Sequence, residues 1–306
     1  MLTITIVLLA ALAPLIQAEL VAYDSQCKDD TNPAFTTFNS NISNDGPLMW
    51  TVDVFADKDA SDSKMGRYWR NFHLSTPTNL NLSDVTGFSG CGIYFYNVTA
   101  ALQVAQNFDN YNEFSCNTVM NSQCQNDLRQ QALDDFDYLS SLKPINNTYY
   151  FDCAYLGSRF TQREIPTSCN LGSQQLTWGQ TRGSFIAGKA ATRDVTGPGV
   201  DCTPNNDTLH NDLLTESAYV GLPHGSEEAK AFQNGTTPVL TLFFNLPDQA
   251  ENASFLPEPE IHLSCLKTIP TKEEQAKING GVRHAATSLL LLAVSAFVVS
   301  ASLHGI

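Results

Sequence analysis

Basic residues are scarce in this chain of 306 residues. It has 17 Lys and Arg against 31 Asp and Glu, which gives a formal net charge of −14 at pH 7. An acidic surface of this kind repels nucleic acids and anionic lipids, so nucleic-acid binding is excluded as a main function. The charge by itself identifies no partner, and solubility is its simplest consequence.

The short motifs of common enzyme chemistries are also missing. The sequence contains no Gly-x-Ser-x-Gly, no phosphate-binding loop and no His-Glu-x-x-His. It has no Cys-x-x-Cys spacing either, so we expect no structural zinc and no other metal or cofactor. The sequence Asp-Val-Thr-Gly occurs at 84–87 and 194–197, but its valine breaks the aspartic protease motif.

The N-terminal segment carries no charged side chain. Residues 1–18 contain an apolar core from Ile4 to Leu15 and end in Ala18, a small residue of the kind preferred before a cleavage site. This pattern predicts a secretory signal peptide that is removed, so that the mature chain begins at Glu19.

The apolar C-terminal run is followed by no basic cluster. Small residues at Asn279, Gly280 and Gly281 precede a short spacer, and residues 289–301 are apolar. This arrangement is typical of the signal for a glycosylphosphatidylinositol (GPI) anchor. It predicts attachment at Asn279, removal of residues 280–306, and a membrane connection through the lipid anchor only.

The alternative for this tail is a transmembrane helix. Such a helix needs about 20 apolar residues and usually a basic cytoplasmic flank. The run here is shorter and is diluted by Ser295, Ser300 and Ser302, so the anchor is favoured. Removal of both terminal segments takes away one base and no acid, leaving 16 bases against 31 acids, a net charge of −15.

The mature chain is expected to form one extracellular domain, 19–267, followed by a short stalk, 268–279. Its eight cysteines are an even number in a secreted chain, which predicts four disulfides without choosing their partners. These cysteines are Cys27, Cys91, Cys116, Cys124, Cys153, Cys169, Cys202 and Cys265.

Asn-x-Ser/Thr sequons are spread along the whole domain and predict N-glycosylation at its surface. The acceptor residues are Asn41, Asn81, Asn97, Asn146, Asn206, Asn234 and Asn252.

Alternation of apolar and polar residues predicts a mainly β domain. In 48–55, for example, Trp50, Val52 and Val54 share one face of a strand. Residues 25–47 are predicted to be a loop, and 211–219 a short helix or turn. Further strands are predicted at 68–74, 91–98, 148–156, 238–246 and 260–266, and weaker ones at 19–23, 176–178 and 184–187.

One amphipathic helix is predicted at 124–142. Ser122 and Gln125 have the spacing of a capping box, and an apolar stripe recurs every three or four residues. Because Cys124 belongs to this stripe, we expect its disulfide to fasten the helix to the sheet. We therefore expect a mainly β fold (antiparallel and β-sandwich-like) or an α+β fold. One helix packs on the sheet, and disulfides cross-link the domain.

Two segments carry a resemblance to a known family. Phe88–Thr99 (FSGCGIYFYNVT) and Phe114–Ala132 (FSCNTVMNSQCQNDLRQQA), in this order, resemble uncharacterised secreted or GPI-anchored proteins of filamentous ascomycete fungi. The resemblance implies a fungal cell surface or wall and supplies no activity or site residues.

Glycoside cleavage requires two carboxylates about 5–10 Å apart. Two local pairs have a suitable spacing: Glu258 with Glu260, and Asp134 with Asp137 on the predicted helix. An acidic surface is the simpler explanation for both pairs, so no catalytic residue is assigned.

Aromatic and imidazole side chains offer further candidates. Trp178 lies in a polar region and is a candidate platform for sugar stacking, whereas Trp50 and Trp69 are expected in the core. Four histidines, His73, His210, His224 and His262, are isolated in the sequence and are expected to be solvated or hydrogen-bonded.

Three functions remain. The favoured hypothesis is a cell-surface or cell-wall glycoprotein with a structural or adhesive role, whose partners are wall polysaccharides or surface proteins. The alternatives are an enzyme that acts on wall polysaccharide through a carboxylate pair, and a module that binds a small extracellular ligand in an apolar pocket.

Overall fold

The computed structural model describes residues 32–57, 64–96, 115–142, 151–169, 181–188, 191, 209–245 and 256–268. Both predicted terminal signals, the anchor residue and the strands expected at 19–23 and 176–178 lie outside these ranges. None of the helices in the described ranges is long and apolar enough to cross a membrane.

Antiparallel strands form two four-stranded sheets, which confirms the predicted fold class. The first sheet has the order β1-β2-β3-β6 and the second β5-β4-β7-β8. The strands are β1 (Asn32–Phe38), β2 (Leu48–Asp57), β3 (Met65–Pro77), β4 (Phe88–Phe95), β5 (Thr181–Ala187), β6 (Leu209–Pro223), β7 (Thr236–Asn245) and β8 (Glu260–Lys267).

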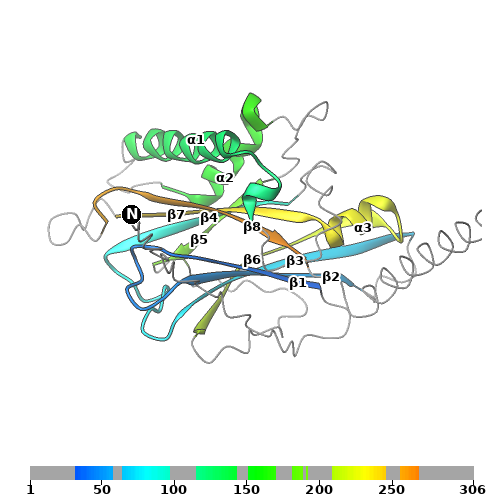
Figure 1. Ribbon diagram of the computed structural model, residues 1–306, viewed down its shortest axis with the longest axis horizontal. Coiled ribbons are helices and arrows are strands. Elements are labelled where there is room, and N and C mark those ends of the chain that lie inside the picture. The colour runs from blue at the N-terminus through cyan, green and yellow to red at the C-terminus, as the bar shows by residue number, and fades with distance from the viewer. Residues whose placement is uncertain are drawn as a thin grey trace, which may run out of the picture.

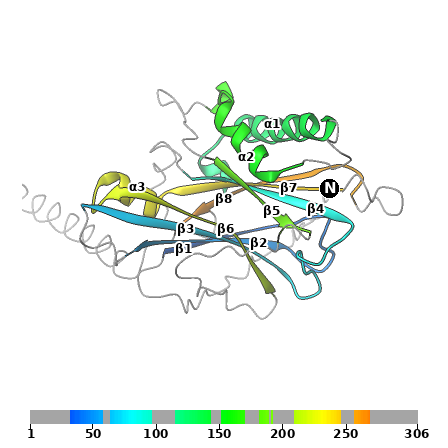
Figure 2. The same ribbon diagram turned by 180° about the vertical axis from the view of Figure 1, so that it is seen from behind.

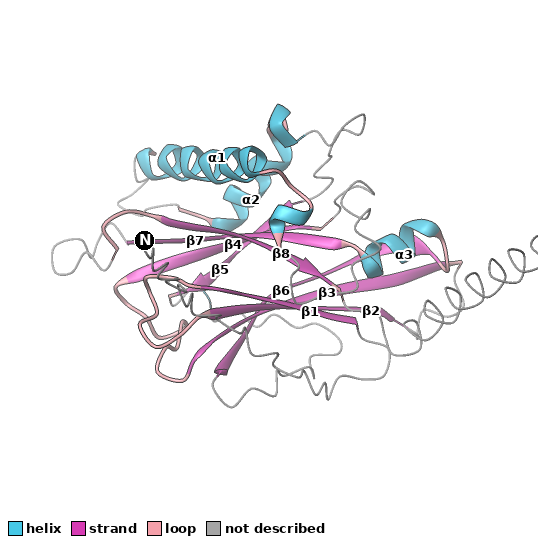
Figure 3. Ribbon diagram, in the orientation of Figure 1, coloured by secondary structure: helices cyan, strands magenta, loops and turns pink. Residues whose placement is uncertain are grey.

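The molecule is layered (Figures 1 and 2). Helices α1 (Ser122–Ser141) and α2 (Cys153–Gln162) cover the face of the second sheet that points away from the first sheet. Helix α3 (Glu227–Asn234) lies at one end of the sandwich, beside β3 and β6. Figure 3 separates these helices from the strands below them.

The space between the sheets is filled by aromatic side chains. Trp50 of β2 is completely buried, as are Phe72 of β3 and Tyr94 of β4. The rings of Phe72 and Tyr94 are 4.7 Å apart, and the Trp50 ring meets Tyr94 edge-on at 5.8 Å. The Trp50 indole donates a hydrogen bond of 2.8 Å to the hydroxyl of Thr241 in β7, which links the sheets and satisfies its buried N–H.

A second core lies between the second sheet and helices α1 and α2. Phe136 of α1 packs on Phe244 of β7 with ring centroids 5.0 Å apart, and Phe160 of α2 packs on Phe95 of β4 at 5.8 Å. Because both faces of the second sheet are covered, every residue of β4 is buried. Burial on both faces explains why its sequence, FSGCGIYF, does not alternate between apolar and polar residues.

Three disulfides fasten the helical layer. Cys91 of β4 pairs with Cys153 of α2, and Cys265 of β8 pairs with Cys116 in a short 3-10 helix before α1. The prediction that Cys124 joins its helix to the sheet is wrong, because Cys124 pairs with Cys169 in the 3-10 helix that follows α2. The remaining two cysteines lie outside the described residues.

The prediction of a strand at 148–156 is wrong for its described part, because helix α2 begins at Cys153. The side chain of Asp152 caps this helix by accepting a hydrogen bond of 2.9 Å from the Ala154 N–H. Cys153, Leu156 and Phe160 then face the core at helical spacing. Local aromatic composition favoured a strand, but the cap and this spacing favour a helix.

Two other local predictions are also wrong. Residues 211–219, expected as a short helix or turn, belong to the long strand β6, which pairs with β3. Part of the predicted loop at 25–47 is strand β1, which pairs with β2. In both cases tertiary pairing outweighs a polar local sequence.

The predicted amphipathic helix is confirmed as α1, but its cap differs. Asn121, rather than Ser122, is the N-cap, and its side chain accepts a hydrogen bond of 2.8 Å from the Cys124 N–H. Gln125 donates instead to Asn117 and to the Met120 carbonyl. The apolar stripe is buried as predicted.

Candidate functional site

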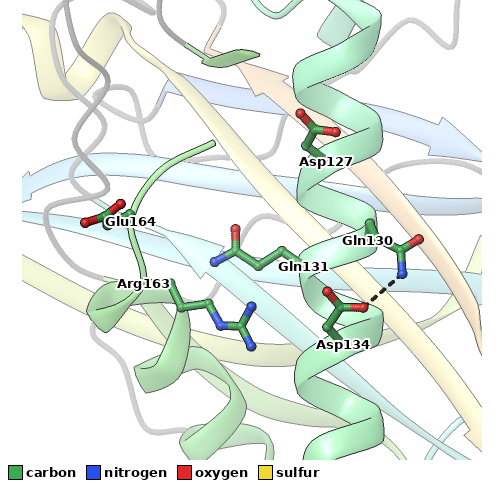
Figure 4. Close-up of a pocket in the computed structure, with 6 residues that line it drawn as sticks. All are labelled: Asp127, Gln130, Gln131, Asp134, Arg163 and Glu164. Atoms are coloured by element: carbon green, nitrogen blue, oxygen red, sulfur yellow. Dashed lines mark hydrogen bonds between the residues drawn. The ribbon is translucent and has the colours of Figure 1, made fainter. Parts of the chain in front are cut away.

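A polar depression lies on the outer surface of the helical layer, between α1 and the residues that follow α2 (Figure 4). It is shallow and open, with a volume of about 390 Å³. The described residues that line it are all polar or charged: Asp127, Gln130, Gln131, Asp134, Arg163 and Glu164.

Helical spacing brings four of these side chains together. Asp127, Gln130, Gln131 and Asp134 are three or four residues apart on α1, so they project from one face of the helix. Gln130 donates a hydrogen bond of 2.9 Å to Asp134 (Figure 4). This bond holds the carboxylate in place and leaves it exposed at the surface.

A buried ion pair positions the opposite wall. Asp135 is completely buried on α1, and its Oδ1 lies 2.8 Å from Nε of Arg159 and 2.5 Å from Nη2 of Arg163. The pKa of Arg159 is raised, and the largest cause is its hydrogen bond to Asp135. A hydrogen bond to Tyr155 adds to this rise. The pair holds Arg163, the C-cap residue of α2, beside α1.

The other end of the depression is fastened by covalent and hydrogen bonds. The Cys124–Cys169 disulfide joins the start of α1 to the segment after α2. Next to it, Ser168 donates a hydrogen bond to Asp127, and Asn121 donates one of 2.8 Å to the Ser168 carbonyl. The two walls are therefore held together at both ends, as a preorganised binding surface requires.

One polar group inside the depression lacks a hydrogen-bond partner among the described residues. Gln131 is only 8% exposed, and no described residue accepts a hydrogen bond from its Nε2. In Figure 4 its amide points across the depression toward the wall formed by Arg163 and Glu164. A buried donor without an acceptor costs about 1–3 kcal/mol, which a ligand that accepts this bond would recover.

Both helices of this layer carry an exposed aromatic ring. Tyr138 follows Asp134 by one helical turn and is 47% exposed, and Tyr155 on α2 is exposed to the same extent. The guanidinium of Arg159 lies over the Tyr138 ring, 4.2 Å from its centroid. A cation–π contact of this kind fixes the ring without covering all of it.

The chemistry of this surface suits the binding of a polar ligand. It offers carboxylates and carboxamides as hydrogen-bonding groups and tyrosine rings beside them. A module for a small apolar ligand would have a concave and mostly apolar pocket instead. Cleavage of a sugar chain would need two carboxylates on opposite sides of the scissile bond, one as acid and one as base or nucleophile.

The sequence-derived carboxylate pairs have different surroundings. Asp134 and Asp137 are both exposed, but only Asp134 lines the depression. Glu258 is exposed, whereas Glu260 accepts hydrogen bonds of 3.1 Å from the hydroxyl of Ser40 and the N–H of Asn41. Glu260 in β8 of the second sheet therefore binds the turn that follows β1 of the first sheet.

The described histidines have polar or aromatic neighbours. His262 lies 2.7 Å from Glu260, and His73 lies 3.3 Å from Asp53, with His73 and Asp53 both buried in the first sheet. Burial is the largest cause that lowers the pKa of His262, and the hydrogen bond to Glu260 opposes it. The exposed ring of His224 lies near Tyr68, and the side chain of His210 is outside the described residues.

Of the predicted core tryptophans, Trp50 is confirmed and Trp69 is not. Trp69 is half-buried, and its ring packs at 4.9 Å against Tyr219, which is 56% exposed. The candidate platform Trp178 lies outside the described residues. Within the described ranges, no group of three or more metal-binding side chains occurs.

Two sequon asparagines, Asn41 and Asn81, are described with their side chains and are exposed, as attachment of a glycan requires. Glycosylation stays a prediction for all seven sequons. The side chains of the others, Asn97, Asn146, Asn206, Asn234 and Asn252, are outside the described residues.

Sequence reasoning identified Asp134 but missed the rest of the depression. Gln131 was missed because it adjoins the apolar stripe of α1, and Arg163 because the preceding segment was assigned to a strand. The available signal was the Asp135 carboxylate, which lies next to buried Phe136 and needs a cationic partner.

Comparison of the chain with protein-family models, curated proteins and solved structures found no match. The chemistry of its own residues is therefore the basis for a function.

Proposed function

We propose that this protein is a GPI-anchored glycoprotein of the cell surface or cell wall with a structural or adhesive role. The predicted signal peptide and anchor signal support this cellular location, and the seven sequons are consistent with it. The resemblance of Phe88–Thr99 and Phe114–Ala132 to fungal surface proteins supports a fungal cell as its source.

The observation that carries the proposal is the disulfide framework. Three disulfides connect the helical layer to the second sheet and connect α1 to the residues after α2. Disulfides of this number form and persist in oxidising compartments, such as the outside of the cell. The surface between α1 and the residues after α2 offers hydrogen-bonding groups that suit the binding of a polar ligand.

Replacement of the anchor residues tests whether a GPI anchor holds the protein at the cell surface. In the full-length chain, Asn279, Gly280 and Gly281 are each replaced by Phe, because a bulky residue blocks the attachment site. We expect the protein to disappear from the cell surface, as measured by antibody staining of intact cells. As a control, Thr271, Lys272 and Glu273 in the stalk are replaced by Phe, and this variant should stay at the surface.

Equal surface staining of both triple variants would refute the GPI anchor and favour a transmembrane tail. Release of the wild type by phosphatidylinositol-specific phospholipase C provides a second readout. This treatment leaves a transmembrane protein in place.

A further inference from the structure

The depression on the helical layer has an excess of negative charge. Three carboxylates line it, those of Asp127, Asp134 and Glu164. Among the described residues of its lining, the one cation is Arg163, which is already paired with the buried carboxylate of Asp135. An incoming ligand therefore meets a surface that attracts positive charge and repels anions.

The hydrogen-bonding groups of this surface are mixed. Its carboxylates accept hydrogen bonds, and Nε2 of Gln131 is a buried donor that lacks an acceptor among the described residues. A hydroxyl group both donates and accepts, so a polyhydroxylated ligand can satisfy both kinds of group. A simple metal ion or a small amine would leave the Gln131 amide without its bond.

An exposed tyrosine one helical turn beyond the depression adds a third requirement for the ligand. Tyr138 lies one helical turn beyond Asp134, and its ring is held by Arg159. Rigid, half-exposed tyrosines bind flat, partly apolar faces at low entropic cost. The pyranose ring of a sugar has such a face, as well as the hydroxyls at its edge.

From these observations we propose that the depression binds a polysaccharide of amino sugars with free ammonium groups. The ammonium groups would lie against Asp134 and Glu164, a hydroxyl would accept the hydrogen bond of Gln131, and one sugar ring would stack on Tyr138. This inference rests on the proposed surface role and names the ligand class through which the protein adheres.

The preorganised walls explain how an open site can bind. The Cys124–Cys169 disulfide and the Asp135–Arg163 ion pair fix both ends of the depression before a ligand arrives. Binding then costs little ordering of the protein, so a few hydrogen bonds and one stacked ring suffice for weak but repeated attachment along a polymer.

Calorimetric titration tests the proposal. The full-length chain is produced in a secretory host and titrated at mildly acidic pH, at which the sugar amines are protonated. The probes are hexamers of β-1,4-linked glucosamine, of its N-acetylated form, of β-1,3-linked glucose and of galacturonic acid. We expect the glucosamine hexamer to bind best and the anionic galacturonic acid hexamer not to bind.

Three variants locate the site. Gln131→Leu removes the unpartnered donor, and Asp134→Asn removes one carboxylate charge and keeps its shape. We expect each to weaken glucosamine binding by about three- to tenfold, the loss of one hydrogen bond or surface charge interaction. Asp137→Asn changes the net charge equally on the same helix outside the depression, and should change the affinity by less than about twofold.

Two results would overturn the proposal. Equal weakening by Asp134→Asn and Asp137→Asn, or equally tight binding of spermidine, would show attraction by charge alone. Equal affinity for the N-acetylated hexamer would show that the ammonium groups are not recognised. The thermal unfolding midpoint of each variant, unchanged from the wild type, shows that the fold is intact.

Failure of this inference is distinguishable from failure of the proposed surface role. Surface staining that depends on Asn279, together with no glucosamine binding, would refute the site and leave the role standing. Specific binding that depends on Gln131, together with staining that does not depend on Asn279, would confirm the site and refute the anchor.

Discussion

The carboxylate of Asp135 lies 2.5 Å from the guanidinium of Arg163, and this contact joins a fully buried anion on α1 to a half-exposed cation after α2. The pair places the second wall of the polar depression against the first. The ion pair also joins α1 to the end of α2, in addition to the disulfides and the apolar contacts of the helical layer.

Replacement of Asp135 by Asn is expected to lower the free energy of unfolding by about 1–3 kcal/mol, because two arginines lose their anionic partner. The cost should stay below the about 3–5 kcal/mol typical of a broken, fully buried pair, because Arg159 and Arg163 can turn toward water. Denaturant unfolding measures the change. Asp137→Asn is the control, with an expected change within about 0.5 kcal/mol, and equal effects would contradict the account.

The contact between Gly157 of α2 and Gly183 of β5 predicts a second large effect. A Cβ at Gly183 would collide with the carbonyl oxygen of Cys153, so Gly183→Ala must push α2 away from the sheet. We expect a loss of about 2–4 kcal/mol in the free energy of unfolding, measured by denaturant titration.

Gly221 of β6 is the matched control for this prediction. A Cβ there would meet only the end of the Met65 side chain, at 4.0 Å. Gly221→Ala should be neutral or stabilising by up to about 1 kcal/mol, because alanine loses less backbone entropy than glycine on folding. A similar destabilisation by both substitutions would show that α2 does not pack directly on β5.

Peptide mapping without reduction tests the disulfide framework. We expect linked peptides for Cys91–Cys153, Cys116–Cys265 and Cys124–Cys169. The even number of cysteines then predicts a fourth pair between the two that remain, Cys27 and Cys202. Alkylation of either of these two cysteines in the native protein would contradict the fourth disulfide.

Acidification should destabilise the fold through His262. Burial lowers the pKa of His262 below its ordinary value of 6.5, so the unfolded chain takes up a proton at a higher pH than the folded chain. The stability contributed by the neutral imidazole is therefore present above about pH 6.5 and is lost as the pH falls toward the folded pKa.

Comparison of the wild type with His262→Gln isolates the contribution of His262 to the pH dependence of stability. Thermal unfolding midpoints are measured for both proteins from pH 8 down through the range below 6.5. The wild type should lose more stability than the variant over this range, because the carboxylates and Arg129 near His262 are common to both. Parallel curves would show that His262 does not titrate differently in the folded state.

How far the fold could be predicted depends on whether each local pattern agrees with tertiary pairing. Strand β2 alternates because the first sheet has an aromatic core on one side, and Trp50, Val52 and Val54 all face it. Helix α1 was predictable because its apolar stripe is long. Strand β6 was not, because its polar sequence is extended only through pairing with β3.

The site was predictable only in part, for the same reason. The exposed carboxylate of Asp134 could be proposed from its spacing on the helix. The opposite wall of the depression, Arg163 and Glu164, comes from a later segment of the chain, and only the packing of α2 on the sheet brings this wall near α1. Gln131 could not be recognised from the sequence, because only the folded surroundings show whether its amide has a hydrogen-bond partner.

The most direct test of the account uses insoluble chitosan, chitin, β-glucan and mannan. The full-length chain from a secretory host is incubated with each polymer, and bound protein is measured in the pellet and new reducing ends in the supernatant. We expect the protein to bind chitosan more than the other polymers and to release no new reducing ends. New reducing ends that vanish on replacement of Asp134, Asp137, Glu258 or Glu260 would contradict it and establish a polysaccharide-cleaving enzyme.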